Sequence, residues 1–468
     1  MLDFLLRVLY NKHKGVVVLV KRVEMATYGL YFMGQNIFYY LLLTFMFTYF
    51  TDMGIPVLTV SAITLIVKIW DAINDPIFGG LVDKLHLKGG KFLPWLRVSL
   101  LAIPAATIFL FAIPVGIPLW VKIIWAVVGY ILWDTAYTIC DVPIFGLVTT
   151  LTDVQSERTA LISTGRACAM AATMAVYVVV PLVHDAIGGW LPIAILLSLA
   201  ALIFMTPICF VARERVRPAV TEGEVGLKQM FKFIAKNKYI LIYNLSFLFS
   251  AGLNVAQVLH MYVARHNLGD ETLMPVLAAL SAGPLIIAGI FIPVLAKRID
   301  KFYLFFWASA LSAALNVVSY FVGYENLWMM YGLTFLRAIP AGVVGVVMFM
   351  FTPDCAEYGQ YKSGVAASGI TFSIQTFAAK LTAAVATAAA GVGMSLIHFV
   401  EGDGAVQLSG FNDKLWVLYL LLPAAGTLLS LPILWRYKLR DKYVEVMVKC
   451  NTGAISREEA DRQLAGKI

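Results

Sequence analysis

The sequence predicts an all-α membrane protein with twelve transmembrane helices in two six-helix bundles. The first observation is composition: of 468 residues, 60% are hydrophobic and only 14% are charged, whereas about a quarter of the residues in a soluble domain are charged. The second is a mean hydropathy of +0.81. The third is a series of apolar segments, most of which reach the roughly 20 residues that a helix needs to cross a bilayer.

Twelve such segments can be counted along the chain, and the longest charged segment separates the sixth from the seventh. Several exceed the bilayer minimum, which implies tilted helices or helices that extend beyond the membrane. The spans are expected at about 27–50, 55–82, 95–115, 118–149, 160–184, 189–212, 238–263, 270–297, 302–323, 326–352, 367–398 and 412–436.

The distribution of basic residues predicts the orientation. Lysine and arginine gather in the even-numbered loops and in the linker, whereas the odd-numbered loops offer only Lys122, Arg265 and Lys414. Both termini are therefore expected in the cytoplasm. Because the basic residues are dispersed among loops, this rule also accounts for the net charge of +8, and no nucleic-acid partner is implied. The expected parts are an N-terminal cytoplasmic tail (1–26), a first bundle (27–212), a cytoplasmic linker (213–237), a second bundle (238–436) and a cytoplasmic C-terminal tail (437–468).

The second span contains a base, two acids and an amide, at Lys68, Asp71, Asp75 and Asn74. One charged residue at the centre of a spanning helix costs about 2.5–3.5 kcal/mol on insertion scales. The spacing of three and four residues places these side chains on one helix face. Several oxygen ligands on one face suit a small hard cation. The alternative is a buried Lys–Asp pair that only fixes helix packing.

The fourth span carries a second polar stripe. Asp134, Thr138, Asp141 and Phe145 follow one another at steps of four, three and four residues, and Tyr137 is adjacent. This spacing predicts a wall for a solute, because carboxylates accept paired hydroxyl groups and aromatic rings offer an apolar face to a sugar ring. A purely structural role is the alternative.

Other polar residues in the spans have more than one interpretation. Gln35 and Asn36 in the first span suit either ligand binding or hydrogen bonding between helices. Arg166 in the fifth span either snorkels to the interface or turns inward to an oxygen ligand. Arg337, near the middle of the tenth span, needs a carboxylate partner or an anionic ligand.

The eleventh span contains Gln375, Thr376 and Lys380. A lysine in an apolar span needs an acid, and Asp71 or Asp75 of the other half is the natural partner. Such a lysine would couple occupancy of the cation site to that of the substrate site. The segment after the tenth span, 354–362, is expected to be a loop. It either forms cytoplasmic ion pairs with Lys84, Lys91 and Arg97 or is an ordinary solvated loop.

Five motifs together resemble one known family. The chain resembles the glycoside–pentoside–hexuronide:cation symporters of the major facilitator superfamily, of the melibiose permease type, from about Tyr28 to the twelfth span. The motifs are Ile69-Trp70-Asp71-Ala72-Ile73-Asn74-Asp75-Pro76, Gly90-Lys91-Phe92-Leu93-Pro94-Trp95, Tyr130-Ile131-Leu132-Trp133, Tyr137-Thr138-Ile139-Cys140-Asp141-Val142-Pro143 and Glu357-Tyr358-Gly359.

The resemblance implies a sodium site and a sugar site. The implied cation ligands are Asp71, Asn74, Asp75 and Thr138, with Lys380 beside them. The implied sugar-binding residues include Tyr137, Asp141, Arg166, Gln375 and Thr376.

Five positions depart from the family pattern and bear on the sugar. Gln35-Asn36 stands where the family has a Lys-Asp pair that binds galactoside, Phe145 and Gly345 stand in place of tryptophans, and Arg337 is additional. The loss of a carboxylate and the gain of an arginine would suit an acidic sugar such as a hexuronide.

We therefore predict a multi-pass transporter of the bacterial cytoplasmic (inner) membrane, monomeric and without a cofactor. It would couple symport of a sugar or glycoside to sodium, with lithium or protons as possible coupling ions, by alternating access at a cavity between the bundles. An enzyme is not expected, because the sequence has no nucleophile–base constellation. The alternatives are a proton-coupled sugar symporter, a carrier of a lipid or other amphiphile on the same fold, and a non-transporting membrane scaffold or sensor.

Overall fold

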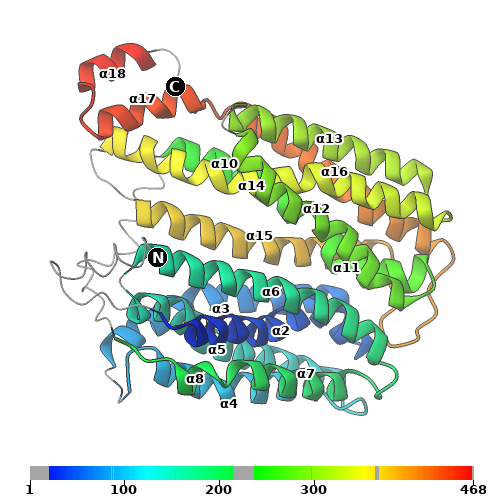
Figure 1. Cartoon of the computed structure of the whole chain (residues 1–468). Helices are drawn as coiled ribbons and strands as arrows, with labels where there is room; N and C mark the ends of the chain where they lie inside the picture. Colours follow the sequence, from blue (N-terminus) through cyan, green and yellow to red (C-terminus); the bar gives the residue numbers. More distant parts are fainter. Residues whose placement is uncertain are drawn as a thin grey trace. The chain divides into compact units, whose positions relative to one another are not determined.

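A computed structural model describes residues 20–85, 87, 89–152, 154–215, 237–296, 298–363 and 368–465. Every regular element in these ranges is a helix (Figure 1). The helices are α2 (Arg22–Asp52), α3 (Val57–Lys84), α4 (Leu93–Leu110), α5 (Leu119–Leu151), α6 (Gln155–Val183), α7 (Trp190–Met205), α8 (Ile208–Val211), α10 (Lys238–Gly252), α11 (Ala256–Tyr262), α12 (Met274–Leu295), α13 (Lys301–Val322), α14 (Leu327–Ser363), α15 (Ser368–Leu396), α16 (Phe411–Trp435), α17 (Asp441–Asn451) and α18 (Arg457–Leu464), with a π-helical turn at Val263–Asn267 and a 3₁₀ turn at Glu271–Leu273.

The prediction of an all-helical membrane protein is confirmed. In the described residues, eleven helical segments are long and apolar enough to cross a membrane, and each corresponds to one of the expected spans. The remaining expected span, at 270–297, is largely covered by α12, whose 22 residues include no charged side chain. The number of twelve spans and the orientation of the termini stay predictions.

Three expected segments differ from the structure in their helix boundaries. The sixth span is divided between α7 and α8 around Pro207, and the seventh is interrupted at 253–255 between α10 and α11. The expected loop at 354–362 is wrong: α14 continues as a helix to Ser363. The physical reason is burial, because Tyr358 and Tyr361 in this segment are only 5% and 2% exposed and belong to the core.

The helices divide into two compact units. The described part of the first unit holds α2, the portion of α3 from Ile69 onward, and α4 to α8; the second holds Pro56–Lys68 and the helices from α10 onward. Within the first unit α2 packs against α6 and α7, and α4 packs against α5. Gly34 permits the close approach of α2 to α7, since a Cβ atom there would lie 2.5 Å from the carbonyl oxygen of Ala201.

The second unit is built around α14, which packs against α12 and α13, while α16 packs against α10 and α13. Its core includes the buried rings of Tyr239, Phe302, Phe351 and Tyr437. The beginning of α3 belongs to this unit, where the Ser61 hydroxyl lies near the carbonyl oxygen of Thr387.

The C-terminal tail is partly helical, as expected, and it is also packed against the second unit. The helices α17 and α18 lie beside the end of α14 (Figure 1). Val444 and Met447 of α17 and Ala460 and Leu464 of α18 are buried in the same core as the end of α14. The amide of Asn451 donates to the carboxylate of Glu357 at 2.8 Å. These contacts make the tail an integral part of the unit.

Polar contacts also fix the last turn of α14 to α18. The hydroxyl of Tyr361 donates to the carboxylate of Asp461, and the guanidinium of Arg457 lies 3.7 Å from the centre of the Tyr361 ring. The hydrogen bond from Tyr361 lowers the pKa of Asp461 below its ordinary value, because it stabilises the carboxylate form.

Candidate functional site

The polar face of α3 is turned into the protein. Asp71 and Asn74 are 6% and 7% exposed, whereas Ile69, Ile73 and Ile77 are 57%, 50% and 63% exposed. The helix is therefore inverted relative to a helix of a soluble protein, with its apolar side outward and its carboxylates inward. Lys68, about one turn before Asp71, is half-buried at the end of the segment that belongs to the second unit.

The hydroxyl group of Thr138 joins α3 to α5. The amide nitrogen of Asn74 donates to the Thr138 hydroxyl at 2.8 Å, and that hydroxyl lies 2.9 Å from Asp75 Oδ1 and 3.1 Å from the carbonyl oxygen of Asp134. A threonine hydroxyl has one proton to donate and two lone pairs. Thr138 therefore accepts from Asn74 while its proton is shared between Asp75 and its own helix.

One turn earlier on each helix, a second bond holds the pair in register. The indole nitrogen of Trp70 donates to the hydroxyl of Thr135 at 3.0 Å. The two cross-helix links thus fix which residues of α3 and α5 face each other. They bring together three of the four predicted cation ligands, with Asp71 buried on the same helix.

The chemistry of these four residues fits a small hard cation. The four side chains offer two carboxylates, an amide oxygen and a hydroxyl oxygen as ligands, and such ions prefer oxygen ligands of this kind. In the Asn74–Thr138 bond the amide nitrogen is engaged, so the carbonyl oxygen is the atom that Asn74 would offer to an ion. Among the described residues no group of three or more His, Cys, Asp or Glu side chains is placed to hold a metal ion.

The next residues along α5 form a polar wall with α2. The amide nitrogen of Gln35 donates to Asp141 Oδ1 at 2.5 Å and to the Tyr137 hydroxyl at 3.2 Å. Gln35 is 1% exposed, and its carbonyl oxygen is buried without a hydrogen-bond partner among the described residues. Gln35, Tyr137 and Asp141 are therefore one connected group with a buried acceptor that lacks a hydrogen-bond partner among the described residues.

Aromatic rings hold Tyr137 in place. Its ring stacks on Trp133 at 5.1 Å and lies 5.5 Å from the ring of Tyr39. Such contacts add about 0.5–1.5 kcal/mol beyond the burial of the rings. Tyr39 and Trp133 were missed as site residues by the sequence analysis; the position of Tyr39, four residues after the predicted Gln35, is the signal that would have found it.

Two further predicted residues lie together at the end of this wall. The guanidinium of Arg166 lies 5.6 Å from the centre of the Phe145 ring, and Phe32 packs on the same ring at 5.2 Å. Arg166 is exposed. Asn36 differs: its amide donates at 2.8 Å to the carbonyl oxygen of Phe32 in its own helix. This bond lies within α2, so it is not the bond between helices that was the alternative to ligand binding, and the role of Asn36 stays a prediction.

In the second unit Arg337 is buried, with 7% exposure, among neutral groups. It donates to the Tyr419 hydroxyl at 2.8 Å and to Asn316 Oδ1 at 3.3 Å, and its guanidinium lies 4.8 Å from the centre of the Tyr419 ring. The expectation of a carboxylate partner is therefore not met among the described residues. The positive charge is solvated by a ring and two oxygen atoms instead.

The remaining predicted residues lie on α15. Gln375 is half-buried, and its carbonyl oxygen is buried without a hydrogen-bond partner in the described part of the chain. Lys380 is half-buried one and a half turns later. The side chain of Thr376 lies outside the described residues.

Comparisons with known proteins agree with this architecture. Residues 27–441 match the family model described as MFS/sugar transport protein. The uncharacterized symporter YjmB of Bacillus subtilis is 26% identical over 429 residues, covering 90% of this chain and 93% of that protein. The isoprimeverose transporter of Lactiplantibacillus pentosus is 27% identical, with 76% of each chain covered.

A solved structure extends the agreement to the fold. A variant of the nucleoside transporter NupG superposes with a TM-score of 0.67 at 13% identity, covering 89% of this chain and all of that one, which supports the fold alone. The resemblance drawn from the motifs is thereby confirmed. The chain belongs to the MFS/sugar transport protein family and is a multi-pass membrane transporter rather than an enzyme.

Proposed function

We propose that the protein is a sodium-coupled symporter of a sugar or glycoside that works by alternating access. The observation that carries the proposal is the Thr138 hydroxyl, which bonds both Asn74 and Asp75 while Asp71 lies buried on the same helix. Buried acids in a spanning helix are costly unless they serve a ligand or a partner. A bound cation would neutralise them.

The neutral oxygens favour sodium over a proton as the coupling ion. A proton needs only one carboxylate with a raised pKa, whereas Asn74 and Thr138 add two uncharged ligands that suit a dehydrated metal ion. The site residues in this proposal are Asp71, Asn74, Asp75 and Thr138. Lithium would use the same oxygens.

The sugar would bind along the wall formed by α2 and α5. Asp141 and the carbonyl oxygen of Gln35, which lacks a hydrogen-bond partner among the described residues, would accept hydroxyl protons from a sugar. The ring of Tyr137, held by Trp133 and Tyr39, offers a flat apolar surface. Phe145 and Arg166 would bound this wall. Gln375 and Thr376 on α15 remain proposed sugar-binding residues.

The two proposed sites are adjacent on one helix, which supplies the coupling. Thr138 follows Tyr137 directly and lies one turn before Asp141. A cation that orders Thr138 would therefore also order the sugar wall, and by thermodynamic linkage the sugar would tighten cation binding by the same factor. Lys68 and Lys380 remain proposed coupling residues, since an ammonium group competes with a cation for a carboxylate.

An acidic sugar is the proposed substrate class. Arg337 is a buried guanidinium whose described hydrogen-bond partners are all neutral, so it retains charge and donors for an anionic ligand. Arg166 supplies a second guanidinium, and this one is exposed. We place the protein in a bacterial cytoplasmic membrane as a monomer with both termini inside.

Uptake into proteoliposomes tests the proposal. Neutral and acidic glycosides are offered with an inward gradient of sodium, lithium or protons, using the wild-type protein and Asp75→Cys. We expect an acidic sugar to accumulate with sodium and Asp75→Cys to abolish that stimulation. The matched control is Thr149→Ala, since Thr149 lies on α5 and its hydroxyl donates to the carbonyl oxygen of Gly146 in the same helix.

The outcomes separate the possible functions. If a pH gradient alone stimulated sugar uptake, the coupling ion would be a proton and not sodium. Uptake that keeps its sodium dependence in Asp75→Cys would refute the assignment of the cation site. The absence of flux for every sugar would favour a lipid carrier or a scaffold.

A further inference from the structure

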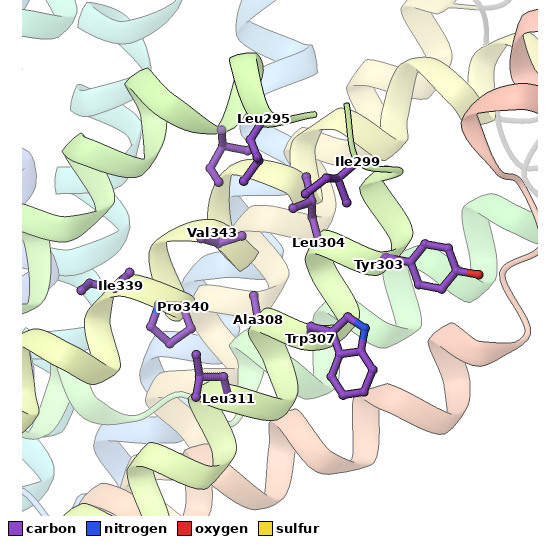
Figure 2. A pocket seen from close by; sticks show the side chains of 11 residues that line it. Leu295, Ile299, Tyr303, Leu304, Trp307, Ala308, Leu311, Ile339, Pro340 and Val343 are labelled. Atoms are coloured by element: carbon purple, nitrogen blue, oxygen red, sulfur yellow. The ribbon is translucent and has the colours of Figure 1, made fainter. Parts of the chain in front are cut away.

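The second unit has an open apolar groove where α12, α13 and α14 meet (Figure 2). Its volume is about 350 Å³, within the range of small-molecule sites. Leu295 and Ile299 line one end, Leu311 and Ile339 line the other, and Trp307 lies along the edge. The groove is a hollow in an exposed surface of spanning helices, where lipid is the surrounding medium.

Two small residues create the hollow. Ala308 on α13 has no side chain beyond Cβ and lies between the larger Leu304 and Leu311 on the same face, at spacings of four and three residues. Pro340 on α14 has a short ring in place of a long side chain. A bulky residue at Ala308 would therefore fill the groove without changing any charge.

One end of the groove has the composition of a membrane interface. Tyr303, Trp307 and Trp435 are exposed by 51%, 67% and 65%, and Trp435 packs 5.4 Å from the neighbouring Phe306 ring. Tyrosine and tryptophan are enriched at the level of the lipid headgroups. The groove thus runs from the headgroup level toward the hydrocarbon region.

The same end is rich in positive charge. The segments 297–301 and 436–442 together contain seven lysine and arginine residues and two aspartates. They lie side by side, since the backbone N–H of Asp441 donates to Asp300 at 3.0 Å. Lys301 is engaged with Asp354 at 2.7 Å and with Asp441 at 3.2 Å.

Two arginines of these segments flank the groove. Arg298 is exposed and adjacent in sequence to the groove residue Ile299. The guanidinium of Arg440 lies 3.4 Å from the centre of the Phe302 ring and 5.6 Å from that of Tyr303, which lines the groove. An anionic group at the mouth of the groove would meet both.

We propose that this groove binds one anionic phospholipid. An acyl chain fills the hollow over Ala308, and the phosphate binds Arg298 and Arg440. Each lysine or arginine at a membrane surface contributes roughly a fivefold factor to binding of anionic lipid. A phospholipid with a neutral headgroup would share the apolar contacts and lack this factor.

Native mass spectrometry of the purified full-length protein tests the proposal. Phosphatidylglycerol or phosphatidylcholine with identical acyl chains is added at matched concentrations. We expect the wild type to retain one phosphatidylglycerol at least about fivefold more strongly than phosphatidylcholine. Ala308→Phe should lose retention of both lipids. Ala105→Phe is the matched control, because Ala105 is an exposed alanine on the spanning helix α4.

A second variant tests the headgroup separately. Arg298→Gln combined with Arg440→Gln should lower retention of phosphatidylglycerol to that of phosphatidylcholine. Equal retention of the two lipids by the wild type would overturn the proposal, as would undiminished retention in Ala308→Phe. A dimer that dissociates in Ala308→Phe would also overturn it, because the groove would then be covered by a second copy of the chain.

Discussion

Removal of the Thr138 hydroxyl should weaken cation binding without removing an acid. In Thr138→Ala the protein loses one proposed cation ligand, the acceptor for Asn74 at 2.8 Å and the donor to Asp75 at 2.9 Å. A hydrogen bond to a charged group contributes about 1.5–3 kcal/mol. Since 1.4 kcal/mol is about a tenfold change in affinity, the sodium concentration for half-maximal uptake should rise roughly 10- to 150-fold.

The assay is sugar uptake into proteoliposomes as a function of sodium concentration, with Thr138→Ser beside Thr138→Ala. Serine keeps the hydroxyl and should restore sodium dependence to within about threefold of the wild type, because it loses only a methyl group. A sodium dependence unchanged in Thr138→Ala would refute the idea that this hydroxyl is a ligand. Equal damage in both variants would point to packing of the methyl group instead.

Three further outcomes follow from the described contacts. Gln35→Leu removes the donor to Asp141 and Tyr137 and should raise the half-saturating sugar concentration about tenfold. The affinity for sodium, measured in the absence of sugar, should stay the same. Arg337→Gln should reduce uptake of acidic sugars about tenfold or more and spare neutral ones, as measured by competition with a glycoside panel. The hydrogen bond from Tyr361 lowers the pKa of Asp461, so this bond stabilises the docking of α18 above the ordinary pKa of an aspartate. That stabilisation is lost as the pH falls through the lowered pKa. The distance between spin labels on α14 and α18 should therefore increase in acid, and Tyr361→Phe should remove this pH dependence.

The polar face of α3 was predictable because helical geometry alone determines it. Residues three and four apart share a face, and an apolar run long enough to span a membrane leaves that face no alternative but the protein interior. Burial of Asp71 and Asn74 follows directly. The pairing of α3 with Thr138 on α5 could not be predicted in this way, since no periodicity within one helix determines its partner. The prediction of this pairing came from the resemblance to a family.

The end of α14 shows why a charged segment was mistaken for a loop. Residues 354–362 contain charged side chains and a glycine, which is typical of loops. In the structure Tyr358 and Tyr361 of this segment are covered by α17 and α18, so tertiary burial outweighs local composition. The covering residues come from about a hundred positions later in the chain, beyond the reach of any local pattern.

Arg337 shows that neutral groups can stabilise a buried guanidinium. Its position in a spanning helix predicted a carboxylate partner or an anionic ligand, and the described contacts supply neither. Tyr419 supplies both a hydroxyl acceptor and an aromatic face, and Asn316 supplies an amide oxygen. Neutral partners stabilise the charge without cancelling it, and a carboxylate in their place would leave little affinity for a second anion. A transporter that had to hold an acidic substrate only briefly would therefore gain from a guanidinium kept among neutral groups.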